Sequence, residues 1–118
     1  MRINIKTTNF SLTPAIQNYL EEKLNSLKKF LPSDESISAD VELGQTTRHH
    51  QKGDIFRAEV NLIIPGSLIR VISEKWDLRV AIDCVKDELQ RKIKDNKEKN
   101  ISLYKRGARL LKKLLKGE

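Results

Sequence analysis

The sequence predicts an α+β domain of order β-α-β-β-β-α, in which two helices cover one face of a four-stranded sheet. Four segments alternate apolar and polar residues, as half-buried strands do. Two further segments repeat apolar residues every three or four positions, as amphipathic helices do. The chain has 118 residues, which is enough for one two-layer core and too few for two.

The predicted strands occupy residues 2–7, 37–43, 56–64 and 68–73. Within the second range every other residue is apolar, from Ile37 to Leu43, so one face of that strand is buried and the other is wet. The last two ranges are joined by Pro65-Gly66-Ser67, which favours a tight turn because proline presets φ and glycine tolerates positive φ. We therefore expect an antiparallel meander with one buried face.

The predicted helices begin at Thr13-Pro14 and at Asp77, where a hydroxyl or a carboxylate can cap free amides. Their apolar stripes consist of Ile16, Leu20, Leu24, Leu27 and Leu31 in the first helix, and of Leu78, Ala81, Ile82, Val85, Leu89 and Ile93 in the second. Pro32-Ser33-Asp34 ends the first helix. A right-handed crossover places both helices on one face of the sheet, so the opposite face, rich in Arg, Glu, Asp and Asn, stays solvated.

The net charge of +7 is concentrated near the C-terminus. Residues 1–85 hold 11 Lys/Arg and 11 Asp/Glu, whereas residues 86–118 hold 12 and 5. This excess favours nucleic acid or an anionic membrane surface, and composition does not choose between them. The apolar pattern breaks at residues 100–102. We therefore expect a domain over residues 1–99 and a basic amphipathic tail over 100–118 that is mobile until it meets a partner.

The first candidate site is a basic flank of the second helix, supplemented from the first helix. Its cations are Arg79, Lys86, Lys94 and Lys97 on one flank, Arg91 on the opposite flank, and Lys23, Lys28 and Lys29 on the first helix. Cations about one turn apart can meet successive phosphates and release counterions. An ordinary solvated helix face is an equally open interpretation. The residues that would neutralise that face are Asp83, Asp87, Glu88 and Asp95.

The loop between the second and third strands is the second candidate. Arg48, Lys52 and the imidazoles of His49 and His50 could contact RNA, although a polar hairpin loop is the commonest explanation of such a sequence. The adjacent histidines point in different directions from an extended chain and have no further ligands nearby. We therefore expect no metal and no other cofactor.

The sequence favours a non-enzymatic protein. No spacing pairs a nucleophile with a base, and there is no glycine-rich phosphate loop. Cys84, the single cysteine, is interpreted as a small buried side chain, and Trp76 as a packing anchor rather than a base-stacking platform. Because no apolar run of about 18 residues and no signal-peptide pattern occurs, we expect a cytoplasmic protein.

Three motifs follow one another along the chain. They are Arg48-His49-His50-Gln51-Lys52-Gly53-Asp54, Arg57-Ala58-Glu59-Val60-Asn61-Leu62 with Pro65-Gly66 after it, and Trp76-Asp77-Leu78-Arg79-Val80-Ala81-Ile82-Asp83. With the lysine-rich end of the second helix through Lys99, they make roughly residues 1–99 similar to the bacterial ribosome hibernation-promoting factors and ribosome-associated inhibitors.

The resemblance implies a fold similar to double-stranded-RNA-binding domains, bound in the decoding channel of the small ribosomal subunit. There it would block the mRNA path and the tRNA A and P sites and inhibit translation in resting cells. The RNA-facing residues it implies are Arg79, Lys86, Arg91, Lys94, Lys97, Lys23, Lys28 and Lys29. Recognition would be by shape and phosphate rather than by base sequence.

Long members of that family carry a second domain that joins two ribosomes. This chain has the length of the short form, so we expect no such domain, and we expect a monomer when it is free. Two alternatives stay open at this point. One is a general structured-RNA-binding module, and the other is a membrane-surface protein whose basic tail lies in an anionic bilayer.

Overall fold

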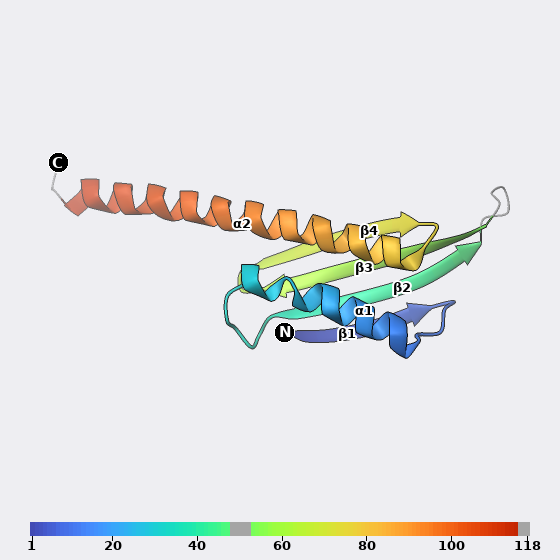
Figure 1. Ribbon diagram of the computed structural model, residues 1–118. Helices are drawn as coiled ribbons and strands as arrows, with labels where there is room; N and C mark the ends of the chain where they lie inside the picture. The colour runs from blue at the N-terminus through green and yellow to red at the C-terminus, as the bar shows by residue number, and fades with distance from the viewer. Residues whose placement is uncertain (48–52, 116–118) are drawn as a thin grey trace.

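The computed structural model describes the backbone of residues 1–47 and 53–115 and the side chains of residues 1–46 and 53–97 (Figure 1). Its elements follow the predicted order. They are β1 (Arg2–Thr8), α1 (Pro14–Asn25), the 3-10 helix η1 (Lys28–Phe30), β2 (Ser38–Thr47), β3 (Asp54–Ile64), β4 (Ser67–Lys75) and α2 (Leu78–Leu115). The α+β prediction is confirmed.

The four strands form one mixed sheet in the order β1-β2-β3-β4. β1 runs parallel to β2, and the β2–β3 and β3–β4 pairs are antiparallel. The connection between β3 and β4 is the predicted tight turn, in which Gly66 has a φ of +74° that only glycine adopts without strain. Both helices lie against the same face of this sheet (Figure 1).

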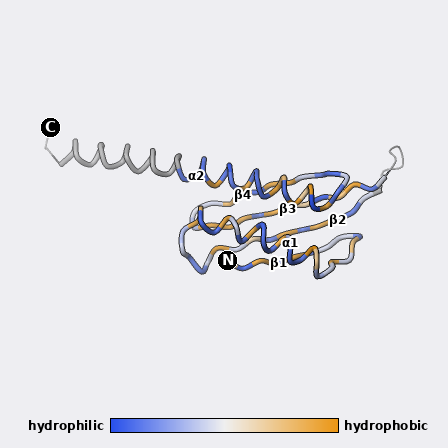
Figure 2. Tube along the Cα trace, viewed as in Figure 1, coloured by the Kyte–Doolittle hydropathy of each residue, from blue (hydrophilic) through white to orange (hydrophobic). Residues whose placement is uncertain are grey.

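The core lies between the helices and the inward face of the sheet. The alternation in β2 and β3 places Ala39, Leu43, Val60 and Leu62 in it, each with an exposed fraction of 0%. From the helices the core receives Leu20 and Leu24 of α1, Leu27 after it, and Leu78, Ala81, Ile82, Val85, Leu89 and Ile93 of α2. Figure 2 shows apolar residues in orange along the strands that lie beneath the helices. Both predicted stripes therefore face the sheet.

The first helix ends earlier than its apolar spacing predicted. Thr13 caps it, since its Oγ1 accepts the backbone N–H of Ile16 at 3.3 Å, but the α-helix stops at Asn25. The backbone then tightens into η1 before Leu31. A 3-10 turn keeps residues three apart on one side, so Leu27 stays fully buried although the helix type has changed.

The second helix is longer than expected. Asp77 caps it through a 2.8 Å hydrogen bond from the backbone N–H of Arg79 to its Oδ1, and 38 residues follow, about 57 Å of helix. The backbone stays helical across residues 100–102, where the apolar pattern is interrupted, because Asn100, Ile101 and Ser102 include no proline or glycine and cost a helix only tenths of a kcal/mol each. Its end extends well past the sheet (Figure 1). The mobility of residues 101–118 in the free protein stays a prediction.

The outward face of the sheet is less uniformly solvated than predicted. Glu59 is only 8% exposed, and its Oε1 accepts hydrogen bonds from Arg70 at 2.6 and 3.1 Å and from Arg57 at 3.3 Å. Two arginines therefore cover one carboxylate on strands β3 and β4. On the same face, Leu68 is 63% exposed. No helix within the described residues has a stretch both long and apolar enough to cross a membrane.

Candidate nucleic-acid interface

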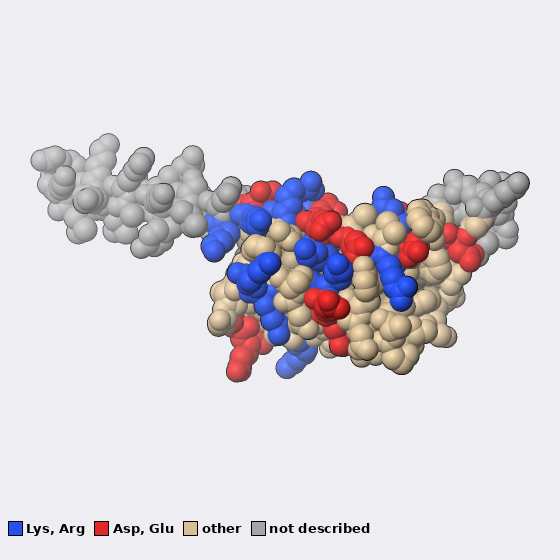
Figure 3. Space-filling model, in the orientation of Figure 1, with Lys and Arg blue, Asp and Glu red and all other residues tan. Residues whose placement is uncertain are grey.

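Basic side chains gather where α1 and η1 run beside α2. We call this surface the basic seam. It consists of Tyr19 and Lys23 of α1, Lys29 and Phe30 of η1, and Arg79, Asp83 and Lys94 of α2. Figure 3 shows lysines and arginines concentrated over this part of the helical face, with fewer acidic groups between them. The sequence prediction that both helices contribute cations to one surface agrees with this arrangement.

Tyr19 organises one end of the basic seam. Its hydroxyl donates a 2.5 Å hydrogen bond to Oδ1 of Asp83, and Nζ of Lys23 lies 3.6 Å from the same oxygen. Nζ of Lys23 and Cζ of Arg79 lie 5.4 and 5.7 Å from the centroid of the Tyr19 ring, within the range of cation–π attraction. One phenol therefore positions two cations and joins α1 to α2.

The same hydrogen bond changes the acidity of Tyr19. Donation to Asp83, then burial and the negative charge of Asp83, raise its pKa to about 12 from an ordinary value of 10.0. The nearby guanidinium of Arg79 acts in the opposite direction and does not cancel this rise. Tyr19 is neutral at physiological pH even at its ordinary pKa, and the shift keeps it a hydrogen-bond donor to a higher pH.

Phe30 organises the other end of the basic seam. Nζ of Lys94 lies 4.8 Å and Nζ of Lys29 lies 5.1 Å from the centroid of its ring. Neither ammonium pairs with a carboxylate among the residues whose side chains are described. The two ammonium groups over one ring repel each other. An anion placed between them would reduce this repulsion and would also attract both charges.

The predicted cations separate into compensated and uncompensated groups. Lys23 pairs with Asp83, Lys86 with Asp87 at 3.8 Å, and Arg91 with Glu88 at 3.7 Å. Lys86 also donates to Gln90 at 2.9 Å. No carboxylate in the described part of the chain pairs with the side chains of Lys28, Lys29, Arg79, Lys94 and Lys97, all of which are exposed. An ordinary solvated helix face, neutralised by its own acidic residues, therefore describes Lys86 and Arg91 better than it describes these five cations.

Arg91 lies away from the basic seam, as its position on the opposite flank predicted. Its partner Glu88 also lies 3.8 Å from Nζ of Lys92, which donates at 3.4 Å to the backbone carbonyl of Arg70 on β4. This flank of α2 therefore faces the β4 side of the sheet. The structure does not bring Arg91 together with Arg79 and Lys94.

Tyr19 and Phe30 are the residues of the basic seam that the sequence patterns did not indicate. Neither residue is among the predicted cations or in the apolar stripe predicted for the first helix. A usable signal was the spacing of Tyr19 and Lys23, because residues four apart on a helix are neighbours on its surface. For Phe30 the sequence holds no comparable signal, since its partner Lys94 is far away along the chain.

The loop candidates lie outside the described residues. Arg48 and Lys52, with His49 and His50 between them, are in this group, and their contact with RNA stays a prediction. Among the residues that the structure does describe, no group of three His, Cys, Asp or Glu side chains could hold a metal ion.

Two interpretations of single residues change. Trp76 is 74% exposed, so it is not the packing anchor that its place beside the helix cap suggested. The residue precedes the first turn of α2 at the end of the sheet, and none of the elements that the structure describes covers it. Cys84 is half-buried rather than buried, because it lies at the margin of the apolar stripe of α2.

Comparison with known proteins places the chain in a family. Residues 3–101 match the model of the family described as "Sigma 54 modulation protein / S30EA ribosomal protein". A ribosome hibernation promotion factor of Picosynechococcus sp. is 30% identical over 100 residues, which are 85% of this chain and 51% of that protein. A ribosome hibernation promoting factor of Pseudomonas putida is 26% identical over 92% of this chain and 98% of its own length. The chain thus spans about half of some relatives and nearly all of others.

Solved structures show the same fold. The N-terminal domain of Thermus thermophilus Protein Y superposes with a TM-score of 0.69 at 33% identity, covering 80% of this chain and 98% of that one. A ribosomal subunit interface protein from Coxiella burnetii superposes with a TM-score of 0.67 over 83% of this chain and 99% of that one. Its 19% identity supports the fold alone.

Proposed function

The chain belongs to the Sigma 54 modulation protein / S30EA ribosomal protein family, and on that premise we propose that it is a ribosome hibernation factor acting on the small subunit. It binds ribosomal RNA in the decoding channel, where it overlaps the mRNA path and the tRNA A and P sites. Translation is inhibited while it is bound. The family assignment agrees with the prediction that the chain is not an enzyme.

The observation that carries this proposal is the set of uncompensated cations on one helical face. Lys29, Arg79 and Lys94 come from two different helical segments and are held over aromatic rings, not over carboxylates. Each phosphate that such a cation neutralises releases counterions condensed on the RNA, which adds to affinity without any demand for base sequence. Structured ribosomal RNA offers phosphates at many orientations, so a rigid surface of this kind suits it.

The test is cosedimentation of the full chain with purified small ribosomal subunits. We expect saturable binding that excess mRNA together with P-site tRNA displaces, and inhibition of translation in a purified system over the same concentration range. Binding that neither mRNA nor tRNA reduces would place the chain elsewhere on the ribosome.

The two alternatives make different predictions in the same assay. A general structured-RNA-binding module would be displaced from subunits by free duplex RNA at similar nucleotide concentrations. A membrane-surface protein would float with anionic vesicles and leave small subunits unbound. Our proposal predicts subunit binding that survives excess duplex RNA, and no flotation at physiological salt.

A further inference from the structure

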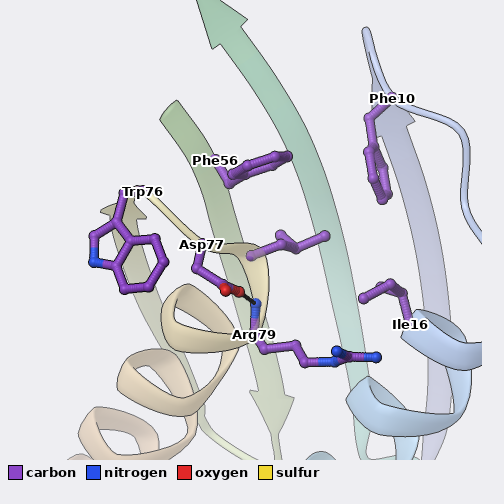
Figure 4. A pocket seen from close by; sticks show the side chains of 7 residues that line it. Phe10, Ile16, Phe56, Trp76, Asp77 and Arg79 are labelled. Carbon is purple, nitrogen blue, oxygen red and sulfur yellow. Dashed lines mark hydrogen bonds between the residues drawn. The ribbon is translucent and has the colours of Figure 1, made fainter. Parts of the chain in front are cut away.

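An aromatic groove of about 300 Å³ lies at one end of the sheet, next to the basic seam. Three aromatic side chains line it: Phe10 from the segment after β1, Phe56 from β3, and Trp76 from the segment before α2. Ile16 and Leu78 add apolar surface. Figure 4 shows Trp76 and Phe10 on opposite sides of the groove, with Phe56 between them and Arg79 extending across it toward Ile16.

Trp76 is far more exposed than a tryptophan that contributes to the core would be. A tryptophan that stabilises a core buries most of its large apolar surface, whereas this indole leaves 74% of its surface in water. Exposed aromatic surface beside partly buried apolar side chains is typical of binding sites. The groove volume is at the lower end of the range for ligand pockets, roughly 300–1,000 Å³, which suits one flat ring system.

The charges around the groove indicate what kind of ring it accepts. The guanidinium of Arg79 forms no ion pair with the described residues, and its cation–π contact with Tyr19 holds it where the basic seam meets the groove. Asp77 lines the groove too, and its carboxylate is engaged in capping α2. A negative group inside the groove disfavours a phosphate there and favours a neutral ring, while Arg79 at the boundary attracts the phosphate attached to that ring.

From these features we propose that the groove receives one unpaired nucleobase of RNA, stacked on Trp76, with the adjoining phosphate bound by Arg79. This rests on the proposed function, in which the basic seam tracks structured RNA. Unpaired bases in RNA loops and bulges are commonly splayed out and stacked on aromatic side chains, and such stacking tolerates any base because every base has a π-face. The groove therefore adds recognition of an unstacked nucleotide to recognition of phosphates.

The chain provides its own reporter, because Trp76 is its only tryptophan. We would titrate the full chain with a short single-stranded RNA and follow tryptophan fluorescence, using the same backbone without bases and an RNA duplex as comparisons. The anisotropy of labelled RNA would report binding independently. We expect saturable quenching by single-stranded RNA and little quenching by the abasic strand or the duplex at equal occupancy.

Substitutions test the stacking directly. Trp76→Ala should weaken single-stranded RNA binding about tenfold, and Trp76→Tyr should restore most of it, since one aromatic face replaces another. Leu68→Ala, at a comparably exposed apolar position on the far face of the sheet, should change nothing. Melting temperatures confirm that all three variants fold.

Several results would overturn the groove assignment. They are unchanged fluorescence in the presence of single-stranded RNA, equal quenching by the abasic strand, and a concentration-dependent spectral shift without RNA, which would mean that a second copy covers Trp76. Binding of small subunits by Trp76→Ala at full affinity, together with unchanged fluorescence of the wild-type chain in the presence of single-stranded RNA, would remove the groove and leave the proposed function intact. Quenching of the wild-type chain by single-stranded RNA, without binding to small subunits, would support the groove and contradict the proposed function.

Discussion

Among single residues, Leu89 shows how the core depends on the contact between α2 and the sheet. It is 0% exposed, as is Val60 on β3. Truncation of a buried leucine typically costs about 2–5 kcal/mol, so Leu89→Ala should lower the free energy of unfolding by that amount in urea denaturation. Leu68→Ala is the matched control, because Leu68 is 63% exposed. Equal losses in the two variants would show that this face of α2 is not buried.

Tyr19 gives a prediction about pH. Its pKa is raised to about 12 in the folded protein from an ordinary 10.0, so the folded state binds its proton more tightly than the unfolded state does. The stability contributed by Tyr19 is therefore complete below pH 10 and is lost as the pH rises through 12. Between pH 10 and 12 the free energy of unfolding should therefore fall less steeply in Tyr19→Phe than in wild type.

The measurement is chemical denaturation of wild type and Tyr19→Phe at several pH values in that window. Lysines also titrate there, so only the difference between the two proteins is informative. At neutral pH the variant should lose about 0.5–1.5 kcal/mol, the usual net contribution of one hydrogen bond. Tyr104→Phe, at the other tyrosine and outside the family match, serves as the control. Parallel pH profiles for wild type and Tyr19→Phe would contradict the role of the Asp83 contact.

Predictions for single residues were correct where they rested on the periodicity of a strand or helix. They were wrong where burial depended on the neighbours of a residue in the folded protein. Strict alternation placed Ala39 and Val60 in the core, because a strand has only two faces. Trp76 sits in a connection, where no period applies, so its apolar character alone suggested burial. Alternation correctly placed Glu59 on the outward face, but it could not show that two arginines from β3 and β4 cover it there.

At the level of elements, the long second helix raises the question of what its far end does. The last buried residue of α2 among the described side chains is Ile93, and residues 101–118 carry six Lys/Arg and one acidic residue, Glu118. Deleting residues 101–118 should therefore leave the melting temperature nearly unchanged. Binding to small subunits should weaken, most visibly at low salt, where cations contribute most.

A full-length variant with the six cations of residues 101–118 changed to glutamine separates charge from length. It should lose as much affinity as the deletion does. If the deletion lowers the melting temperature markedly, the leucines of this segment pack on the domain. If subunit binding survives and vesicle binding disappears, the segment is a membrane anchor, as the rival interpretation holds.

Sequence reasoning predicted the elements better than their ends. Capping residues Thr13 and Asp77 marked both helix starts correctly, since a cap requires particular side chains. The end of α1 at Asn25 was missed, because a following 3-10 turn preserves the apolar spacing. At residues 100–102 the apolar spacing is interrupted but the backbone is not, since side-chain pattern and helix propensity are separate properties.

For the whole molecule, the pattern of charge matters more than its total. The sequence identified which cations occur on each helix, and from α-helical geometry alone it separated Arg91 from Arg79 and Lys94. It also named Asp83, Asp87 and Glu88 as neutralising residues, but it could not show that they pair with Lys23, Lys86 and Arg91, because these pairings depend on side-chain geometry. Nor could it show that Lys29 and Lys94 share the ring of Phe30, since that contact joins distant parts of the chain.

The most direct test of the account is the salt dependence of small-subunit binding by Lys29→Gln/Lys94→Gln. The matched control is Arg2→Gln/Lys6→Gln, which removes the same charge from exposed positions on the outward face of β1. If the basic seam meets phosphates, the first variant should bind more weakly, and its slope of log K against log salt should be smaller by about two, with the control unchanged. A wild-type slope in a folded seam variant, or an equal loss in the control, would contradict the account.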